Sequence, residues 1–166
     1  MKKTLMFLMM MAAALGLAAQ TGLFGISFGD DLNRADSLMS QAGFVAEDVE
    51  GTMVKYYSDY NKLVESVVLF VQPDMEWVAG WFVLYYKENT EQQDRYVLDR
   101  LHRMHGEEVL IDQEAQFITW FFDDTRTVTY GYASTGNLCV YYHDSHFEEV
   151  FDLPPSALRR ITESKE

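Results

Sequence analysis

The sequence has one cysteine, three prolines and only 13 Lys and Arg residues against 26 Asp and Glu. One cysteine excludes an internal disulfide framework, so packing alone must hold the fold together. Cys139 stands in an apolar, strand-like run, where a small half-buried hydrophobic side chain fits better than a reactive thiol. The net charge of −13 argues against nucleic acid or anionic lipid as a partner, because phosphates require clustered Lys and Arg.

Signatures of common catalytic sites are absent as well. There is no Gly-x-Ser-x-Gly elbow, no His-Glu-x-x-His helix and no glycine-rich phosphate loop. The best candidates for holding a metal ion are His143 and His146, which stand close to Glu148 and Glu149. Such a cluster at a strand end is more often a polar turn. The sequence therefore predicts no catalytic residue and no cofactor, and a metal-dependent enzyme is the least favoured alternative.

The N-terminal stretch has the composition of an export signal. Lys2 and Lys3 are followed by 16 uncharged residues, Thr4 to Ala19, that are rich in Leu, Met, Phe and Ala and end in small residues. Because a membrane-spanning helix needs about 20 apolar residues, we expect residues 1–19 to be a signal peptide and not a transmembrane anchor. Its removal leaves 11 Lys and Arg against 26 Asp and Glu, a net charge of −15. We expect a soluble protein exported to the periplasm or the cell exterior.

Two helix signals and two sets of strand signals follow. Asp31 is placed to cap a helix that Gly43 ends, and Thr90 with Gln93 has the form of a capping box for a second helix that stops at Gly106. Apolar residues recur at spacings of three and four inside both. Three strand-like runs come after each helix, at residues 52–58, 63–71 and 80–86, and at residues 116–122, 126–132 and 136–142.

The two sets of strands close on similar sequences. Residues 80–86 and 136–142 share an opening glycine, an apolar middle and a closing pair of tyrosines. The pattern predicts an α+β domain over residues 20–152, made of a tandem repeat of a helix plus a three-stranded antiparallel meander. The repeats cover about 24–89 and 90–144, both helices pack on one face of the sheet, and residues 153–166 form a C-terminal tail. Whether the halves share one sheet or form two is left open.

The stretch Phe24-Gly25-Ile26-Ser27-Phe28-Gly29, followed by Asp36-Ser37-Leu38 and Gly43-Phe44, resembles the opening of small secreted bacterial α+β modules. The tandem arrangement is similar in outline to the β-lactamase inhibitory protein, and each half is similar to outer-membrane assembly lipoproteins of the SmpA/BamE type. This resemblance implies a non-enzymatic binding protein. The lipoprotein cysteine and the inhibitor's paired cysteines are both absent, so neither a membrane anchor nor that inhibitor's activity is implied.

Alternation along the strands predicts which side chains face away from the helices. With Lys55, Thr119 and Asn137 as polar markers of the outward side, the third strands place Phe82, Leu84, Tyr86, Leu138, Val140 and Tyr142 inside. The predicted outward aromatic set is Tyr57, Trp81, Tyr85, Phe121 and Tyr141.

An exposed aromatic face of this kind suits recognition of a protein or peptide partner. The first hypothesis is therefore an exported binding module. The alternative is a structural envelope component that self-associates through the same face as a homodimer. A third interpretation makes this face ordinary core, covered by the C-terminal tail or by a second copy of the chain.

Overall fold

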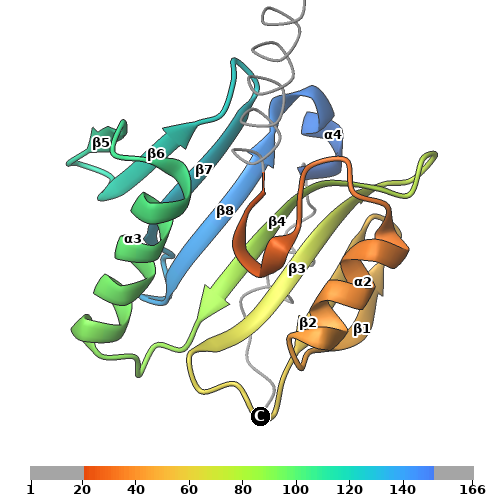
Figure 1. The fold of residues 1–166 in the computed structure, drawn as a ribbon, viewed down its shortest axis with the longest axis horizontal. Helices are drawn as coiled ribbons and strands as arrows, with labels where there is room; N and C mark the ends of the chain where they lie inside the picture. Colours follow the sequence, from red (N-terminus) through yellow and green to blue (C-terminus); the bar gives the residue numbers. More distant parts are fainter. Residues whose placement is uncertain (1–20, 152–166) are drawn as a thin grey trace, which may run out of the picture.

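One antiparallel sheet of eight strands organises the chain in the computed structural model, which describes residues 21–151 (Figure 1). The expected signal peptide and C-terminal tail lie outside these residues. The elements in chain order are η1 (Leu23–Gly25), α2 (Leu32–Gln41), β1 (Val45–Glu50), β2 (Met53–Tyr57), β3 (Val64–Gln72), β4 (Trp77–Tyr85), α3 (Glu91–His105), β5 (Leu110–Asp112), β6 (Phe117–Phe121), β7 (Arg126–Tyr132), β8 (Leu138–Asp144), η2 (Ser145–Phe147) and α4 (Glu148–Phe151).

The strands lie in the order β1-β2-β3-β4-β8-β7-β6-β5. The two halves meet through their last strands, where Trp81 to Leu84 of β4 pair with Tyr142 to Cys139 of β8. The expected α+β class with an antiparallel sheet is confirmed, and the sheet is continuous. Each of α2 and α3 is followed by four strands instead of the predicted three, because β1 and β5 escaped the sequence pattern.

Both long helices begin at the caps that the sequence indicates. The Asp31 carboxylate accepts a hydrogen bond from the N–H of Asn33 at 2.9 Å, and Thr90 and Gln93 form a complete capping box. Gly43 follows α2 with φ of 84°, a left-handed conformation that glycine adopts without strain. None of the helices among residues 21–151 is long and apolar enough to cross a bilayer. The buried residues of α2 and α3 are Ala35, Met39, Val97 and Leu101.

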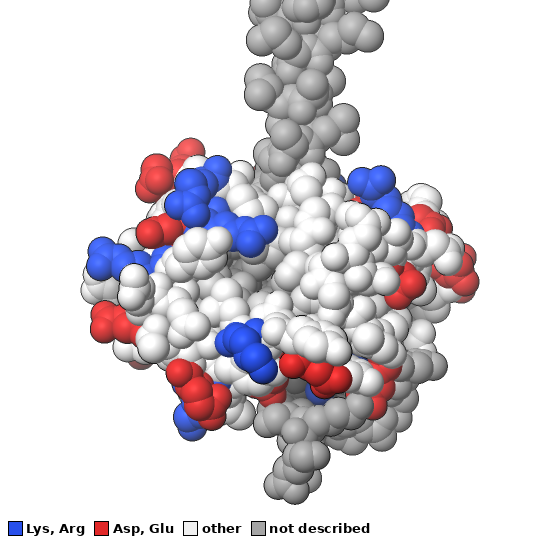
Figure 2. Space-filling view, turned by 60° about the horizontal axis from the view of Figure 1, so that its bottom comes forward, with Lys and Arg blue, Asp and Glu red and all other residues white. Residues whose placement is uncertain are grey.

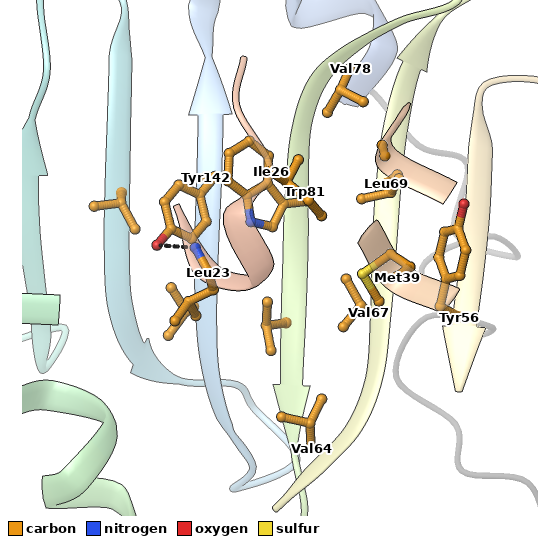
Figure 3. Packing of buried hydrophobic residues seen from close by; sticks show 14 of the residues in the cluster. Leu23, Ile26, Met39, Tyr56, Val64, Val67, Leu69, Val78, Trp81 and Tyr142 are labelled. Atoms are coloured by element: carbon orange, nitrogen blue, oxygen red, sulfur yellow. Dashed lines mark hydrogen bonds between the residues drawn. The ribbon is translucent and has the colours of Figure 1, made fainter. Parts of the chain in front are cut away.

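The main core lies between the sheet and these two helices (Figure 3). At its centre the rings of Trp81 and Tyr142 stack with centroids 4.1 Å apart, and both side chains are fully buried. The N–H of Leu23 donates to the Tyr142 hydroxyl at 3.1 Å. A side chain at Gly22 would collide with both rings, so the backbone of the N-terminal segment closes the core directly over the junction of the two halves.

A smaller apolar cluster covers part of the opposite sheet face. Val150 of α4 packs there with Met53, Val68, Phe70 and Ala79, and partly buried aromatic rings surround them. Strand β4 therefore contributes buried side chains to both faces of the sheet. We call the face opposite α2 and α3 the second face.

Candidate functional site

The structure separates the five aromatic residues that the sequence predicted on one outward face. Trp81 and Tyr85 are 0% and 3% exposed and belong to the main core on the helix side. Their predicted outward placement is wrong. Phe82 and Leu84, predicted inside, lie on the second face, because Phe82 pairs with Tyr141 and Leu84 with Cys139.

The register between β4 and β8 explains this error. Directly paired residues share a face of the sheet, and Trp81 is opposite Tyr142. Matching the two closing tyrosine pairs by sequence instead gave Tyr85 and Tyr141 the same face. In β8 the prediction is right, since Leu138, Val140 and Tyr142 all belong to the main core. The marker Asn137 is itself buried, and its amide donates to the Tyr85 carbonyl at 2.9 Å and to Glu65 at 3.0 Å.

The other three aromatic residues lie on the second face without forming one patch. Tyr57 is half-buried on β2, five strands from Phe121 on β6, which is a separation on the order of 24 Å. Tyr141 is half-buried against Phe70 and Phe151, with ring centroids 6.1 and 5.8 Å away. Of the five predicted residues, Phe121 alone is largely exposed, at 59%.

Phe121 has exposed apolar neighbours that the sequence analysis did not single out. Leu110 of β5 is 59% exposed and Phe117 of β6 is 37% exposed. Leu110 pairs with Thr119, and Phe117, Thr119 and Phe121 alternate along β6, so all of them face the same side. We call Leu110, Phe117 and Phe121 the β5–β6 patch. The apolar run Val109 to Ile111, set between acidic residues, is the sequence signal that could have revealed it.

A glycine and three threonines lie beneath and beside the side chains of this patch. The Phe117 ring lies over Gly131 of β7, where any added side chain would collide with it. The hydroxyls of Thr119 and Thr129 lie 3.1 Å apart across β6 and β7, and Thr127 pairs with Phe121. The side chains that lie beside the exposed rings on β6 and β7, Thr119, Thr127 and Thr129, are therefore uncharged.

The charges of the segment that forms the β5–β6 hairpin have one sign. From Glu107 to Thr125 the chain holds six carboxylates and no Lys or Arg. On the face shown in Figure 2, by contrast, basic and acidic side chains are interspersed. The next basic residue, Arg126, bonds through Nε to the buried Asp144 carboxylate at 2.8 Å. The six carboxylates, all exposed, are Glu107, Glu108, Asp112, Glu114, Asp123 and Asp124.

The weak metal candidates His143 and His146 are not gathered into a ligand set. His143 packs its ring against Phe151, with centroids 4.6 Å apart. His146 lies 3.4 Å from Asp144, but that carboxylate is already held by Arg126 and by a backbone N–H. Within the described residues, no group of three or more His, Cys, Asp or Glu side chains could hold a metal ion.

Two other features have structural roles. Burial raises the pKa of the Cys139 thiol to about 11, which keeps it protonated and unreactive. Two adjoining cavities of about 390 and 400 Å³ lie between the β2–β3 loop and the start of α3. Their amides are already engaged, since Asn61 accepts from the N–H groups of Leu63 and Val64, and Gln93 belongs to the capping box.

Comparisons with protein-family models, with curated proteins and with solved structures find no match for this chain. The resemblance to inhibitory proteins and SmpA/BamE-type units stays a prediction. The surface of the chain itself is therefore the basis on which a function can be proposed.

Proposed function

We propose that the protein is an exported binding module that contacts a protein partner through the β5–β6 patch. The observation that carries this proposal is the exposure of Leu110, Phe117 and Phe121 side by side on one face of an edge hairpin. Burying such side chains on binding removes apolar area from water, and large rings contribute contact area at low entropic cost. Export rests on the sequence pattern of residues 1–19.

The proposed two-part architecture agrees with this assignment. We propose that the halves arose by duplication of a helix-and-meander unit, because a helix followed by four strands occurs twice in the same order. Large exposed apolar side chains occur on β5 and β6, whereas Val45 alone is largely exposed among the large apolar side chains described in β1 and β2. A binding surface confined to one half is expected if only that half was adapted for a partner.

Photo-crosslinking tests the proposal. A photo-reactive residue replaces Thr127, which pairs with Phe121, and a control protein carries it at Tyr60, which is 90% exposed in the β2–β3 loop. We expect an adduct of one defined partner mass at 127 and none at 60. Leu110→Ser with Phe121→Ser should abolish the adduct while circular dichroism stays unchanged.

Other outcomes would favour the self-associating alternative or contradict the proposal. An adduct of twice the chain's mass would favour the self-associating alternative. An adduct that survives the two serine substitutions, or that forms equally at Tyr60, contradicts a role for the patch.

A further inference from the structure

We propose that the free edge of β5, together with the β5–β6 patch, binds an extended basic segment of a partner polypeptide as an added strand. The inference rests on the proposed function and names the chemistry of the partner. Three independent features lead to it: a strand edge with no partner among the described strands, exposed side chains on both faces of that strand, and charge of one sign along the hairpin segment.

The edge of β5 offers backbone groups for pairing. β5 is last in the strand order, and no other described strand pairs with its outer side. Leu110 and Ile111 alternate to opposite faces of the sheet, and each is 59% exposed. An edge strand of this kind exposes N–H and C=O groups that a further strand can satisfy, and alternate side chains then give specificity.

The opposite edge of the sheet is better protected. β1 has a register shift between Asp48 and Glu50, and the acidic Glu47 of this strand is exposed. Bulges and charged residues are common devices against unwanted strand addition. β5 has a regular register with β6 over all three of its residues. Strand addition is therefore favoured at β5 and disfavoured at β1.

The distribution of charge along the hairpin indicates the chemistry of the partner. Since β5 and β6 are antiparallel with Leu110 opposite Thr119, Glu107 and Glu108 lie at the same end of the hairpin as Asp123. Asp112 and Glu114 lie at the other end, where the Asp112 carboxylate accepts from the N–H of Glu114 at 3.0 Å. A strand laid along β5 passes between two acidic ends, so Lys or Arg flanking an apolar centre fits it.

A second copy of this chain fits poorly at the same edge. It would bring the same carboxylates against those of the first, within a chain whose net charge is already −13. Like charges placed opposite each other across strands are destabilising, and a large net charge of one sign keeps proteins apart. A cationic partner is attracted by the same carboxylates, and its affinity must decrease as the salt concentration increases.

The test uses three synthetic seven-residue peptides and isotope-labelled full-length protein. The first peptide has three central valines flanked by two lysines on each side, the second has glutamates in place of these lysines, and the third is the lysine–valine peptide with N-methylated backbone amides. Amide shifts in the protein NMR spectrum report the site and the affinity. We expect only the first peptide to bind, with the largest shifts at Leu110, Ile111 and Asp112 and binding about tenfold weaker at 300 mM than at 20 mM salt.

Matched variants test whether binding needs the β5 edge in particular and whether it needs the carboxylates at the ends of the hairpin. Ile111→Ser should weaken binding about tenfold, whereas Val45→Ser, which changes an equally exposed edge residue on β1, should leave it unchanged. Glu108→Gln with Glu114→Gln should weaken binding, whereas Glu88→Gln with Glu91→Gln should not, although all four side chains are exposed.

The inference is overturned if the N-methylated peptide binds as tightly, if the glutamate peptide binds equally, or if the shifts lie elsewhere. A partner crosslinked at position 127, combined with no peptide binding at β5, would leave the proposed function standing while removing the basic strand. If neither the crosslink at position 127 nor peptide binding at β5 is observed, the proposed function and the binding of a basic strand are both contradicted.

Discussion

One histidine in the core couples folding to pH. The ring of His105 packs against Phe122 with centroids 4.9 Å apart, and its Nε2 lies 3.1 Å from the Tyr142 hydroxyl. Burial lowers the pKa of His105 from 6.5 to about 4. The neutral ring is therefore the form compatible with the folded core.

Between pH 6.5 and 4 the unfolded chain binds a proton at His105 that the folded chain does not. Stability must therefore fall as the pH is lowered through this window. Allowing for the partial exposure of the ring, we expect a loss of about 1–2 kcal/mol between pH 7 and pH 4.5. Urea denaturation at both pH values should show His105→Gln losing less stability than the natural protein. An equal loss in His105→Gln and in the natural protein would contradict this role for His105.

At the scale of single elements, local chemistry determines the two long helices. The caps at Asp31 and at Thr90 with Gln93 satisfy N–H groups that have no partner within the helix, and the apolar stripes decide which side is buried. These signals lie within a few residues of the helix ends. Both helices could consequently be predicted from sequence, with boundaries close to those observed.

The capping box provides a direct measurement of this local contribution. Thr90→Ala removes the oxygen that accepts from the Gln93 N–H at 3.3 Å and leaves the first turn of α3 without its side-chain acceptor. We expect a loss of about 1 kcal/mol in the free energy of unfolding, measured by urea denaturation. Thr90→Ser retains the hydroxyl and should lie within a few tenths of a kcal/mol of the natural protein. Equal losses for both variants would contradict a capping role.

Strands were less accessible to prediction, for two physical reasons. β5 has three residues, all exposed, so it lacks an alternating pattern that marks a half-buried strand. β4 has the opposite property, because Trp81 and Val83 are buried on one face and Leu84 on the other. When an apolar strand is buried on both sides, its sequence does not indicate which residues face which side of the sheet. Leu110 was missed for the first of these reasons, whereas Phe121 was found because Thr119 marks the outward side of β6.

At the scale of the whole molecule, the core joins the two halves into one unit. The main cluster contains Val67 and Trp81 from the first half and Trp120 and Tyr142 from the second. The Tyr142 hydroxyl connects the N-terminal segment, β8 and α3 through Leu23 and His105. Neither half could lose its packing without exposing apolar surface of the other.

We therefore expect one cooperative unfolding transition. Tyr142→Phe leaves the Leu23 N–H without its hydroxyl acceptor and should cost about 1–3 kcal/mol. Far-ultraviolet circular dichroism and tryptophan fluorescence should shift together, and Trp120→Phe should show that the remaining signal from the first half follows the same curve. Two separated transitions would contradict the joined core.

The junction of β4 with β8 also has a consequence for biosynthesis. β4 ends at Tyr85, but its neighbour β8 begins at Leu138, after the whole of α3 and three further strands. While the ribosome is still translating the second half, the first half has an unpaired strand edge next to an uncovered Trp81. Such an edge is prone to pairing with other chains. A chain that crosses a membrane before folding would require a chaperone to keep this edge covered until residues 138–144 have followed.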